Sequence, residues 1–344
     1  MRIKKISLSP ELEKRFFEEK LSKREILELK EISEAYQKFI NPEWSSLRYR
    51  PYSQYFGFIN ALKTRKVLEE LWQYSYLNSS LGSIDFLDFG AGTLGATLGA
   101  MDFFKEKKIK IEKLYSLDQD QSVMKWSMQY FKDFLPASIE FLSHLKDQAP
   151  RITVMANVWN EILFRSSDDE FHSNPIWQQL EQQMKKASEE SLWIFIEPSS
   201  REINHKFLKL RDYLSQNLNI LLPCTHQQAC PALAANEWCH EERAFKAPNQ
   251  FWELVRSLGY RQKNLLYSFL VVGKSASQFK SSEARILSKD LGGKGRCEKW
   301  LCADGKRWKE SRLSRFKNEQ NASFYEGLKG DIIESASTFS DTKS

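Results

Sequence analysis

The sequence lacks a long uninterrupted apolar run. Its most apolar stretch, residues 86–104, is broken by Asp88, by Asp102 and by several glycines. It therefore does not supply the roughly 20 consecutive apolar residues that a membrane-spanning helix needs. We expect a soluble protein that has no contact with a membrane.

The first residues also lack the apolar core of an export signal, and the acidic residues from Glu11 onward are not typical of a transit peptide. These features predict a cytoplasmic location. Cysteine is scarce, with five residues, an odd number. A disulfide framework is not expected in such a chain, so the thiols are free, catalytic or metal-bound.

Apolar bulk and basic charge, by contrast, are plentiful. The chain has 344 residues, of which 41 % are hydrophobic, and its 23 Phe and 10 Trp exclude a disordered protein. The net charge is +6, and residues 281–320 hold 11 Lys or Arg against 6 Asp or Glu, an excess of five. Trp300, Trp308 and Phe316 interleave with these charges. The stretch is therefore either a nucleic-acid contact, through phosphate neutralisation and stacking, or a solvated basic face.

Helix signals dominate the first 80 residues. Ser22 and Glu25 form a capping box, and apolar residues at helical spacing follow them. This helix is expected to end before Pro42, and a second helix is expected over roughly residues 54–74.

From residue 83 onward, short apolar runs alternate with longer amphipathic segments, which predicts an α/β fold with a parallel sheet. In such sheets ligands bind beyond the carboxyl ends of the strands. The expected strands are Ile84–Phe89, Lys113–Asp118, Ser138–Leu142, Ile152–Val158, Leu192–Glu197 and Leu265–Gly273.

A glycine loop follows the first expected strand. Gly90, Gly92 and Gly95 fit the spacing of the dinucleotide-binding fingerprint, and Asp118 at the end of the next strand is suited to accept hydrogen bonds from ribose hydroxyls. NAD and S-adenosylmethionine both carry an adenosine ribose, so these residues do not separate the two cofactors. A tight turn without a ligand is the structural alternative.

Two features favour S-adenosylmethionine. Asp88 lies two residues before the first glycine, and this acidic-x-Gly-x-Gly pattern resembles the first motif of class I methyltransferases. The final strand, residues 265–273, resembles the antiparallel seventh strand of that fold. Leu94 departs from the motif, since many family members have glycine there.

The fourth expected strand leads into Asn157, Asn160 and Glu161, at the place where methyltransferases bind the methyl acceptor. The segment is neither an Asp/Asn-Pro-Pro-Tyr motif nor one with a nucleophilic cysteine. Methyl transfer can proceed largely by positioning of donor and acceptor, so Asn157 and Glu161 are the catalytic candidates. Capping of the strand and of the following helix is the alternative role.

Three cysteines, Cys224, Cys230 and Cys239, fall within 16 residues and predict a metal site. They lack the Cys-x2–4-Cys spacing that is usual in structural zinc sites. Zinc, with His226 or His240 as the fourth ligand, is therefore the second choice.

An iron–sulfur cluster needs four thiolates, and the fourth would come from Cys302 or Cys297 in the basic stretch. Such a cluster would tie that stretch to the sheet domain. Buried thiols without a metal are the remaining alternative.

Over residues 47–331 the chain resembles the small-ribosomal-subunit methyltransferase-like family of the Rsm-twenty-two type, which occurs in mitochondria and bacteria. The paired Pro-Cys-x-His and Trp-Cys-His segments are the most specific part of the resemblance. The matching motifs are Asp88-Phe-Gly-Ala-Gly92, Asn157-Val-Trp-Asn-Glu-Ile162, Phe195-Ile-Glu-Pro198, Pro223-Cys-x-His-x3-Cys-Pro-x7-Cys-His240 and Leu301-Cys-x-Asp-Gly305.

The resemblance implies a Rossmann-like class I fold, built on a seven-stranded sheet, that binds S-adenosylmethionine through Asp88, Gly90, Gly92 and Asp118. It further implies a 4Fe-4S cluster held by Cys224, Cys230, Cys239 and Cys302. The implied partner is the small ribosomal subunit or its precursor, with rRNA methylation, subunit assembly or both as the role.

The implied organisation has four parts: a helical region (1–80), a methyltransferase-like domain (81–275) with a cysteine-rich insertion (219–245), a basic segment (276–332) and a disordered tail (333–344). A non-catalytic assembly factor is the alternative function. An NAD-dependent oxidoreductase is a third interpretation, supported by the glycine spacing alone.

Overall fold

The computed structural model describes residues 5–38, 40, 42–79, 81–145, 149–164 and 173–334. The expected tail lies almost wholly outside these residues. Two compact units form, one from residues 1–196 and 243–265, the other from residues 197–242 and 266–344. None of the described helices combines the length and the apolar character needed to cross a bilayer.

The first unit begins with helices, and the capping box is confirmed: the Ser22 hydroxyl accepts from the Glu25 backbone N–H, and the Glu25 carboxylate accepts from the Ser22 N–H. The predicted second helix, residues 54–74, is confirmed by continuous helical structure over residues 53–73. A short helix that the sequence did not predict, Ser46–Tyr52, precedes it and contains Pro51, a usual helix breaker. The helices are α1 (Pro10–Phe16), α2 (Lys23–Gln37), α3 (Ser46–Tyr52), the π-helical turn η1 (Ser53–Gly57) and α4 (Phe58–Gln73).

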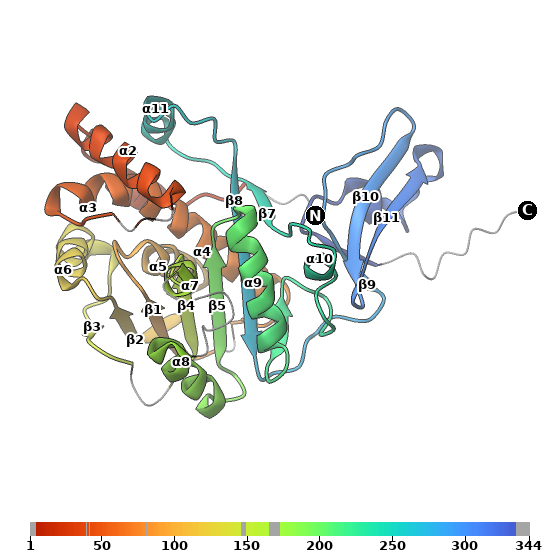
Figure 1. Cartoon of the computed structure of the whole chain (residues 1–344), viewed down its shortest axis with the longest axis horizontal. Helices are drawn as coiled ribbons and strands as arrows, with labels where there is room; N and C mark the ends of the chain where they lie inside the picture. Colours follow the sequence, from red (N-terminus) through yellow and green to blue (C-terminus); the bar gives the residue numbers. More distant parts are fainter. Residues whose placement is uncertain are drawn as a thin grey trace, which may run out of the picture. The chain divides into compact units, whose positions relative to one another are not determined.

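The same unit contains a parallel sheet in which strands lie in the order β3-β2-β1-β4-β5 (Figure 1). The strands are β1 (Ser83–Phe89), β2 (Lys110–Leu117), β3 (Ile139–Leu142), β4 (Ile152–Ala156) and β5 (Leu192–Glu197). The intervening helices are α5 (Gly95–Lys107), α6 (Gln121–Tyr130), the short η2 (Lys132–Phe134), α7 (Trp159–Phe164) and α8 (Pro175–Lys186). The sheet order reverses between β1 and β4, which is the point where ligands bind in Rossmann-like folds. The predicted α/β, Rossmann-like class is confirmed.

Glycines let α4 and α5 approach closely. A Cβ added to Gly99 would lie 2.1 Å from the Ala61 carbonyl oxygen, and one on Gly95 would lie 2.6 Å from the Gly57 carbonyl oxygen. The third glycine of the loop motif therefore serves helix packing and not ligand contact.

The segment 243–265 belongs to the first unit, where Arg243 pairs with Glu70 of α4 at 3.0 Å and Ile6 bridges Phe245. It contains α11 (Asn249–Ser257), whose Phe251 packs on Phe58.

In the second unit β6 (Asn219–Leu222) pairs antiparallel with β8 (Asn264–Gly273), as expected for the last strand of the fold. The other elements nearby are α9 (Arg201–Leu214), α10 (Pro231–Ala234) and β7 (Glu241–Ala244), which begins at the unit boundary. The described α/β part thus has eight strands where seven were expected. The prediction missed β6 and β7 because four-residue strands give little periodicity.

The basic segment folds as a four-stranded antiparallel sheet in the order β11-β10-β9-β12 (Figure 1, blue). Its elements are β9 (Glu283–Ile286), β10 (Arg296–Ala303), β11 (Lys306–Leu313), η4 (Ser314–Phe316), α12 (Ala322–Glu326) and β12 (Ile332–Glu334). Cys297, Leu301 and Phe324 lie in its own buried core. The Lys299 ammonium also points inward, where it donates to the carbonyls of Phe324 (2.5 Å) and Gly327 (2.6 Å).

Candidate functional site

A cavity of ≈ 200 Å³ lies at the carboxyl ends of β1, β2 and β4, within the first unit. Three carboxylates line it, and no lysine or arginine occurs among its described lining residues. These are Tyr36, Trp44, Tyr52, Phe89, Gly90, Gly92, Thr93, Leu117, Asp118, Gln119, Asp120, Val123, Ala156, Asn157, Val158, Glu161, Asn174 and Ile176.

Two of the predicted glycines are required by the loop. Gly90 has φ +74°, and a Cβ there would lie 2.2 Å from Cγ2 of Val158. Gly92 has φ +47° and faces open space, so its backbone is exposed to a ligand in the cavity. Leu94 adopts φ +59°, a left-handed conformation that glycine adopts more readily than leucine does.

Asp118 fastens the glycine loop to the end of β2. Its carboxylate accepts from the backbone N–H of Gly92 (2.8 Å) and from that of Asp120 (2.9 Å). Burial raises the pKa of Asp118, and these two hydrogen bonds partly oppose the rise. Asp118 also lines the cavity, as predicted for a ribose-binding residue.

Asp88 lies behind the loop and is not among the residues that line the cavity. Its carboxylate is 1 % exposed and accepts from the backbone N–H (2.9 Å) and the hydroxyl (2.7 Å) of Thr97. The residue therefore joins β1 to the first turn of α5 and can act on a ligand only by positioning the loop.

Stability should depend on pH through Asp88. Burial raises the pKa of its carboxyl from the usual 3.8 to about 6, against the opposing hydrogen bonds from Thr97. The folded chain thus holds this proton more tightly than the unfolded chain, so the stabilisation is complete below pH 3.8 and is lost as the pH rises through about 6. The free energy of unfolding should fall by up to roughly 1.4 kcal/mol per pH unit in that window.

The measurement is urea unfolding at a series of pH values for the wild type and for Asp88→Asn. Asparagine keeps an acceptor oxygen for Thr97 but does not ionise, so the variant should lack this pH dependence. If the free energy of unfolding changed with pH in the same way for both proteins, ionisation of Asp88 would not destabilise the fold and the prediction would be wrong.

The two catalytic candidates both line the cavity. Asn157 has φ +60°, and its Nδ2 donates to Oδ1 of Asn60 at 2.9 Å. Its own Oδ1 is buried without a hydrogen-bond partner among the described residues. Glu161 follows in the first turn of α7. Asn160, the third polar residue of the segment, is not among the lining residues.

Residues from the N-terminal helices also line this cavity, which no motif predicts. Three aromatic side chains form a wall: Tyr36 of α2, Tyr52 of α3, and Trp44 of the segment between these helices. The ring centroids are 4.9 Å apart for Trp44 and Tyr52 and 6.4 Å apart for Tyr36 and Tyr52. The only available signal was the density of aromatic residues between positions 36 and 56, which is also typical of a core.

The four predicted metal-binding cysteines line a second cavity, of ≈ 40 Å³, within the second unit: Cys224, Cys230, Cys239 and Cys302. Cys297 does not, because it is buried in the core of the small sheet. Among the described residues, no group of three or more His, Cys, Asp or Glu side chains already stands at metal-ligand spacing. The thiols are gathered, but their arrangement does not by itself define a metal centre.

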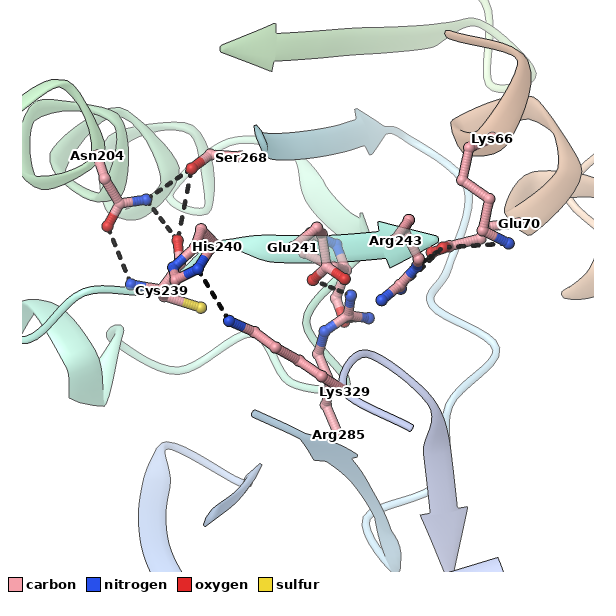
Figure 2. A network of polar contacts seen from close by, with 11 residues as sticks. Lys66, Glu70, Asn204, Cys239, His240, Glu241, Arg243, Ser268, Arg285 and Lys329 are labelled. Carbon is pink, nitrogen blue, oxygen red and sulfur yellow. Dashed lines mark hydrogen bonds and ion pairs between the residues drawn. The ribbon is translucent and has the colours of Figure 1, made fainter. Parts of the chain in front are cut away.

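One face of α9 holds the cysteine-bearing segments. Asn204 accepts from the Cys239 N–H at 3.0 Å and donates to Ser268 at 2.8 Å (Figure 2). Two turns later, Asp212 accepts from the Cys230 N–H at 3.0 Å. Arg211, buried beside it, donates to the carbonyls of residues 226 and 228.

A tight turn brings Cys302 to the same cavity. Asp304 and Gly305 have φ +46° and +67°, the two left-handed positions of a two-residue hairpin turn between β10 and β11. Cys302 Sγ lies 3.5 Å from Nε2 of His226, and Asp304 accepts from Gln228 at 2.9 Å. The Asp-Gly pair of the sequence motif thus sets the position of the fourth cysteine.

The thiols are buried beside cationic groups. Burial, followed by the charge of Cys224, raises the pKa of Cys230 to about 11 and that of Cys239 to about 12. A metal bound here must therefore displace these protons. The guanidinium groups of Arg211, Arg285 and Arg307 also line the cavity. Their ion-pair partners are Asp212, Glu241 and Glu237, respectively.

Both candidate histidines for zinc also line this cavity. Burial, then the charge of Arg211, lowers the pKa of His226 to about 4, so its ring is neutral at pH 7. His240 Nε2 is 3.1 Å from the Lys329 ammonium, which donates to it (Figure 2).

Most cations of the basic stretch serve the fold. Seven of the 11 are buried or ion-paired: Arg285, Lys289, Lys299, Arg307, Lys309, Arg312 and Lys317. The other four are exposed and form no ion pair with the residues described: Lys294, Arg296, Lys306 and Arg315. Phe316 is 61 % exposed beside Arg315. The basic surface is therefore smaller than the composition predicts.

The profile of a known family, described as "Mitochondrial small ribosomal subunit Rsm22", matches residues 79–334, about three quarters of the chain. The matched residues include the glycine loop of the first cavity, the four cysteines of the second cavity and the four-stranded sheet of the basic segment. They do not include the N-terminal helices α1 to α4. No curated protein matches the chain significantly.

Among solved structures, similar chains include a proposed class I S-adenosylmethionine-dependent methyltransferase from Listeria monocytogenes (12 % identity, 78 % of this chain and 80 % of that chain covered, TM-score 0.41). S-adenosylmethionine-dependent methyltransferases from Aquifex aeolicus (13 %, 67 % and 98 %, 0.32) and Clostridium acetobutylicum (12 %, 85 % and 85 %, 0.30) are also similar. These scores are too low to assign a ligand or an activity.

Proposed function

The chain belongs to the Rsm22 family of the mitochondrial small ribosomal subunit, and from that premise we propose that it binds S-adenosylmethionine and acts on the small ribosomal subunit or its precursor. Methylation of rRNA, assistance in subunit assembly, or both would be its role. The family description names mitochondria, so the cytoplasmic location stays a prediction.

The cavity of the first unit carries the proposal for S-adenosylmethionine. Asp118 would accept from the ribose hydroxyls, and the backbone at Gly90 and Gly92 would pass beneath the ligand. Three lining carboxylates, with no lysine or arginine among the lining residues that the structure describes, suit a cationic sulfonium compound. The same charge disfavours the pyrophosphate of NAD, which leaves the oxidoreductase interpretation without support from charge.

Asn157 and Glu161 would then contact the methyl acceptor. The acceptor's lone pair would attack the methyl carbon as the bond between that carbon and the sulfonium breaks, which releases neutral S-adenosylhomocysteine. Positioning of the two reactants supplies most of what such a step needs. A proton lost by an amino acceptor would pass to Glu161 or to solvent.

The second cavity supports a 4Fe-4S cluster held by Cys224, Cys230, Cys239 and Cys302. Three thiols from the cysteine-rich insertion and one from β10 line the same space, which matches the four thiolates that such a cluster needs. When bound, the cluster would join the cysteine-rich insertion, through three thiolates, to β10, through one. Zinc is the second choice, because neutral His226 lies beside Cys302.

Contact with rRNA would use the exposed part of the basic segment. Lys294, Arg296 and Arg315 supply charge there, and Phe316 supplies an exposed ring.

A non-catalytic assembly factor is the second candidate. The observation that favours it is the hydrogen bond from Asn157 Nδ2 to Asn60, which gives Asn157 a structural role in the absence of any substrate.

Transfer of a labelled methyl group from S-adenosylmethionine to immature small subunits tests the enzymatic proposal. We expect label in rRNA at about one methyl group per particle or less. Binding of the cofactor without any incorporation would exclude the enzyme and leave the assembly factor.

A further inference from the structure

We propose that Tyr36 and Tyr52, from the N-terminal helices, form an aromatic contact surface for the sulfonium group of the methyl donor. The inference rests on the proposed S-adenosylmethionine site and assigns a ligand contact to helices that the family match does not include.

The position of the donor's sulfur follows from the two ends of the cavity. The adenosine ribose is assigned to Asp118 at the end of β2, and the acceptor to Glu161 after β4. Because the methyl group must reach the acceptor, the sulfonium lies between these two carboxylates. Tyr36 and Tyr52 line the same cavity as Asp118 and Glu161. The two rings therefore border the part of the cavity that the sulfonium occupies.

The two rings are held in place before any ligand binds. The rings of Tyr36 and Tyr52 pack edge-on against each other, with centroids 6.4 Å apart. Phe56 packs edge-on against Tyr36 at 5.6 Å and tilted against Tyr52 at 5.0 Å, and Trp44 packs edge-on against Tyr52 at 4.9 Å. A fixed aromatic surface loses little side-chain entropy when it receives a ligand.

The electrostatics of the wall favour a cation. Burial, together with the charge of Glu161, raises the pKa of both tyrosines above its usual value, so the rings remain neutral phenols with electron-rich faces. Asp118, Asp120 and Glu161 add negative charge, and no described lysine or arginine lines the cavity to oppose it. A cation against an aromatic face in such surroundings is attracted by the ring quadrupole. S-adenosylhomocysteine has a neutral thioether at that place and lacks this attraction.

An aromatic wall could instead stack the base that accepts the methyl group. The sulfonium is favoured here because three carboxylates, Asp118, Asp120 and Glu161, line the same cavity as the wall, and a cation suits such surroundings better than a neutral base does.

The test compares the affinities of the full-length protein for S-adenosylmethionine and S-adenosylhomocysteine by isothermal titration calorimetry. Tyr52→Leu should weaken S-adenosylmethionine about tenfold and S-adenosylhomocysteine less than about twofold. Tyr52→Phe keeps the ring and is the matched control, so it should retain nearly the wild-type ratio of the two affinities. Binding of S-adenosylhomocysteine to Tyr52→Leu also shows that this variant is folded.

Equal weakening of both ligands in Tyr52→Leu would overturn the inference, because it would reflect loss of packing alone. Unchanged affinities combined with lost methyl transfer would also overturn it and assign the wall to the acceptor base. A wild-type protein that binds neither ligand would refute the proposed cofactor site itself, which is a different failure.

Discussion

Replacing Cys302 by alanine should remove more than about nine tenths of the iron and acid-labile sulfide from protein purified without oxygen. Cys302 supplies one of four thiolates to the proposed cluster, and it reaches the cavity from β10, a different segment from the other three. Loss of a residue that only supports a metal ligand lowers metal affinity about ten- to hundredfold, and loss of the ligand itself should lower it further. The visible absorption of the cluster should disappear with the iron.

The matched control is Cys297→Ala, a change of the same kind on the same strand. Cys297 is 3 % exposed in the core of the small sheet and does not line the cysteine cavity. This variant should keep wild-type iron and sulfide, while its unfolding midpoint falls slightly because a small buried group is lost. Equal iron loss in both variants would point to a folding defect and not to a ligand.

The metal assay also separates the two metals. Stoichiometric zinc without sulfide in the wild type would replace the cluster by a zinc site, for which His226 stands beside Cys302 at 3.5 Å. His226→Ala would then lower the zinc content, whereas an all-cysteine cluster should tolerate that change. No metal in the anaerobic wild-type protein would exclude both sites.

Local patterns predicted the parts of the fold that depend on local sequence. The buried strand β5 begins and ends at the predicted residues, Leu192 and Glu197, because an apolar run bounded by polar residues defines it. The glycine loop was predictable for a similar reason, because its glycines directly follow an apolar run. The left-handed backbone at Gly90 and Gly92, and the close approach of Gly90 to Val158, favour glycine at both positions.

Other features depend on contacts between distant residues and were missed. The sheet of the basic segment exists because β9 pairs with β12, more than 40 residues later in the chain, and because Lys299 is satisfied by carbonyls near Gly327. Charge counting treated Lys299 as surface. The resemblance to the first methyltransferase motif predicts that Asp88 binds the cofactor. Its hydrogen bonds to Thr97 are visible only in the folded chain.

Asp118→Ala is expected to weaken S-adenosylmethionine about a hundredfold. The change removes the proposed acceptor for the ribose hydroxyls and frees the Gly92 N–H, and each hydrogen bond to a charged group is worth about 1.5–3 kcal/mol. Asp133→Ala removes the same charge from an exposed site outside the cavity and should bind as the wild type does. Calorimetric titration of both variants measures the difference.

The same variant separates the two proposed functions when small-subunit maturation is followed in cells. If methyl transfer is the essential activity, Asp118→Ala should impair maturation as strongly as Cys230→Ser, because the cofactor site and the cysteine site are then both needed. If the fold and the cysteine site serve assembly alone, small subunits should mature normally in cells with Asp118→Ala and should fail to mature in cells with Cys230→Ser. Asp118 belongs to the first unit and Cys230 to the second, and neither residue lines the other's cavity, so neither substitution removes a residue of the other site.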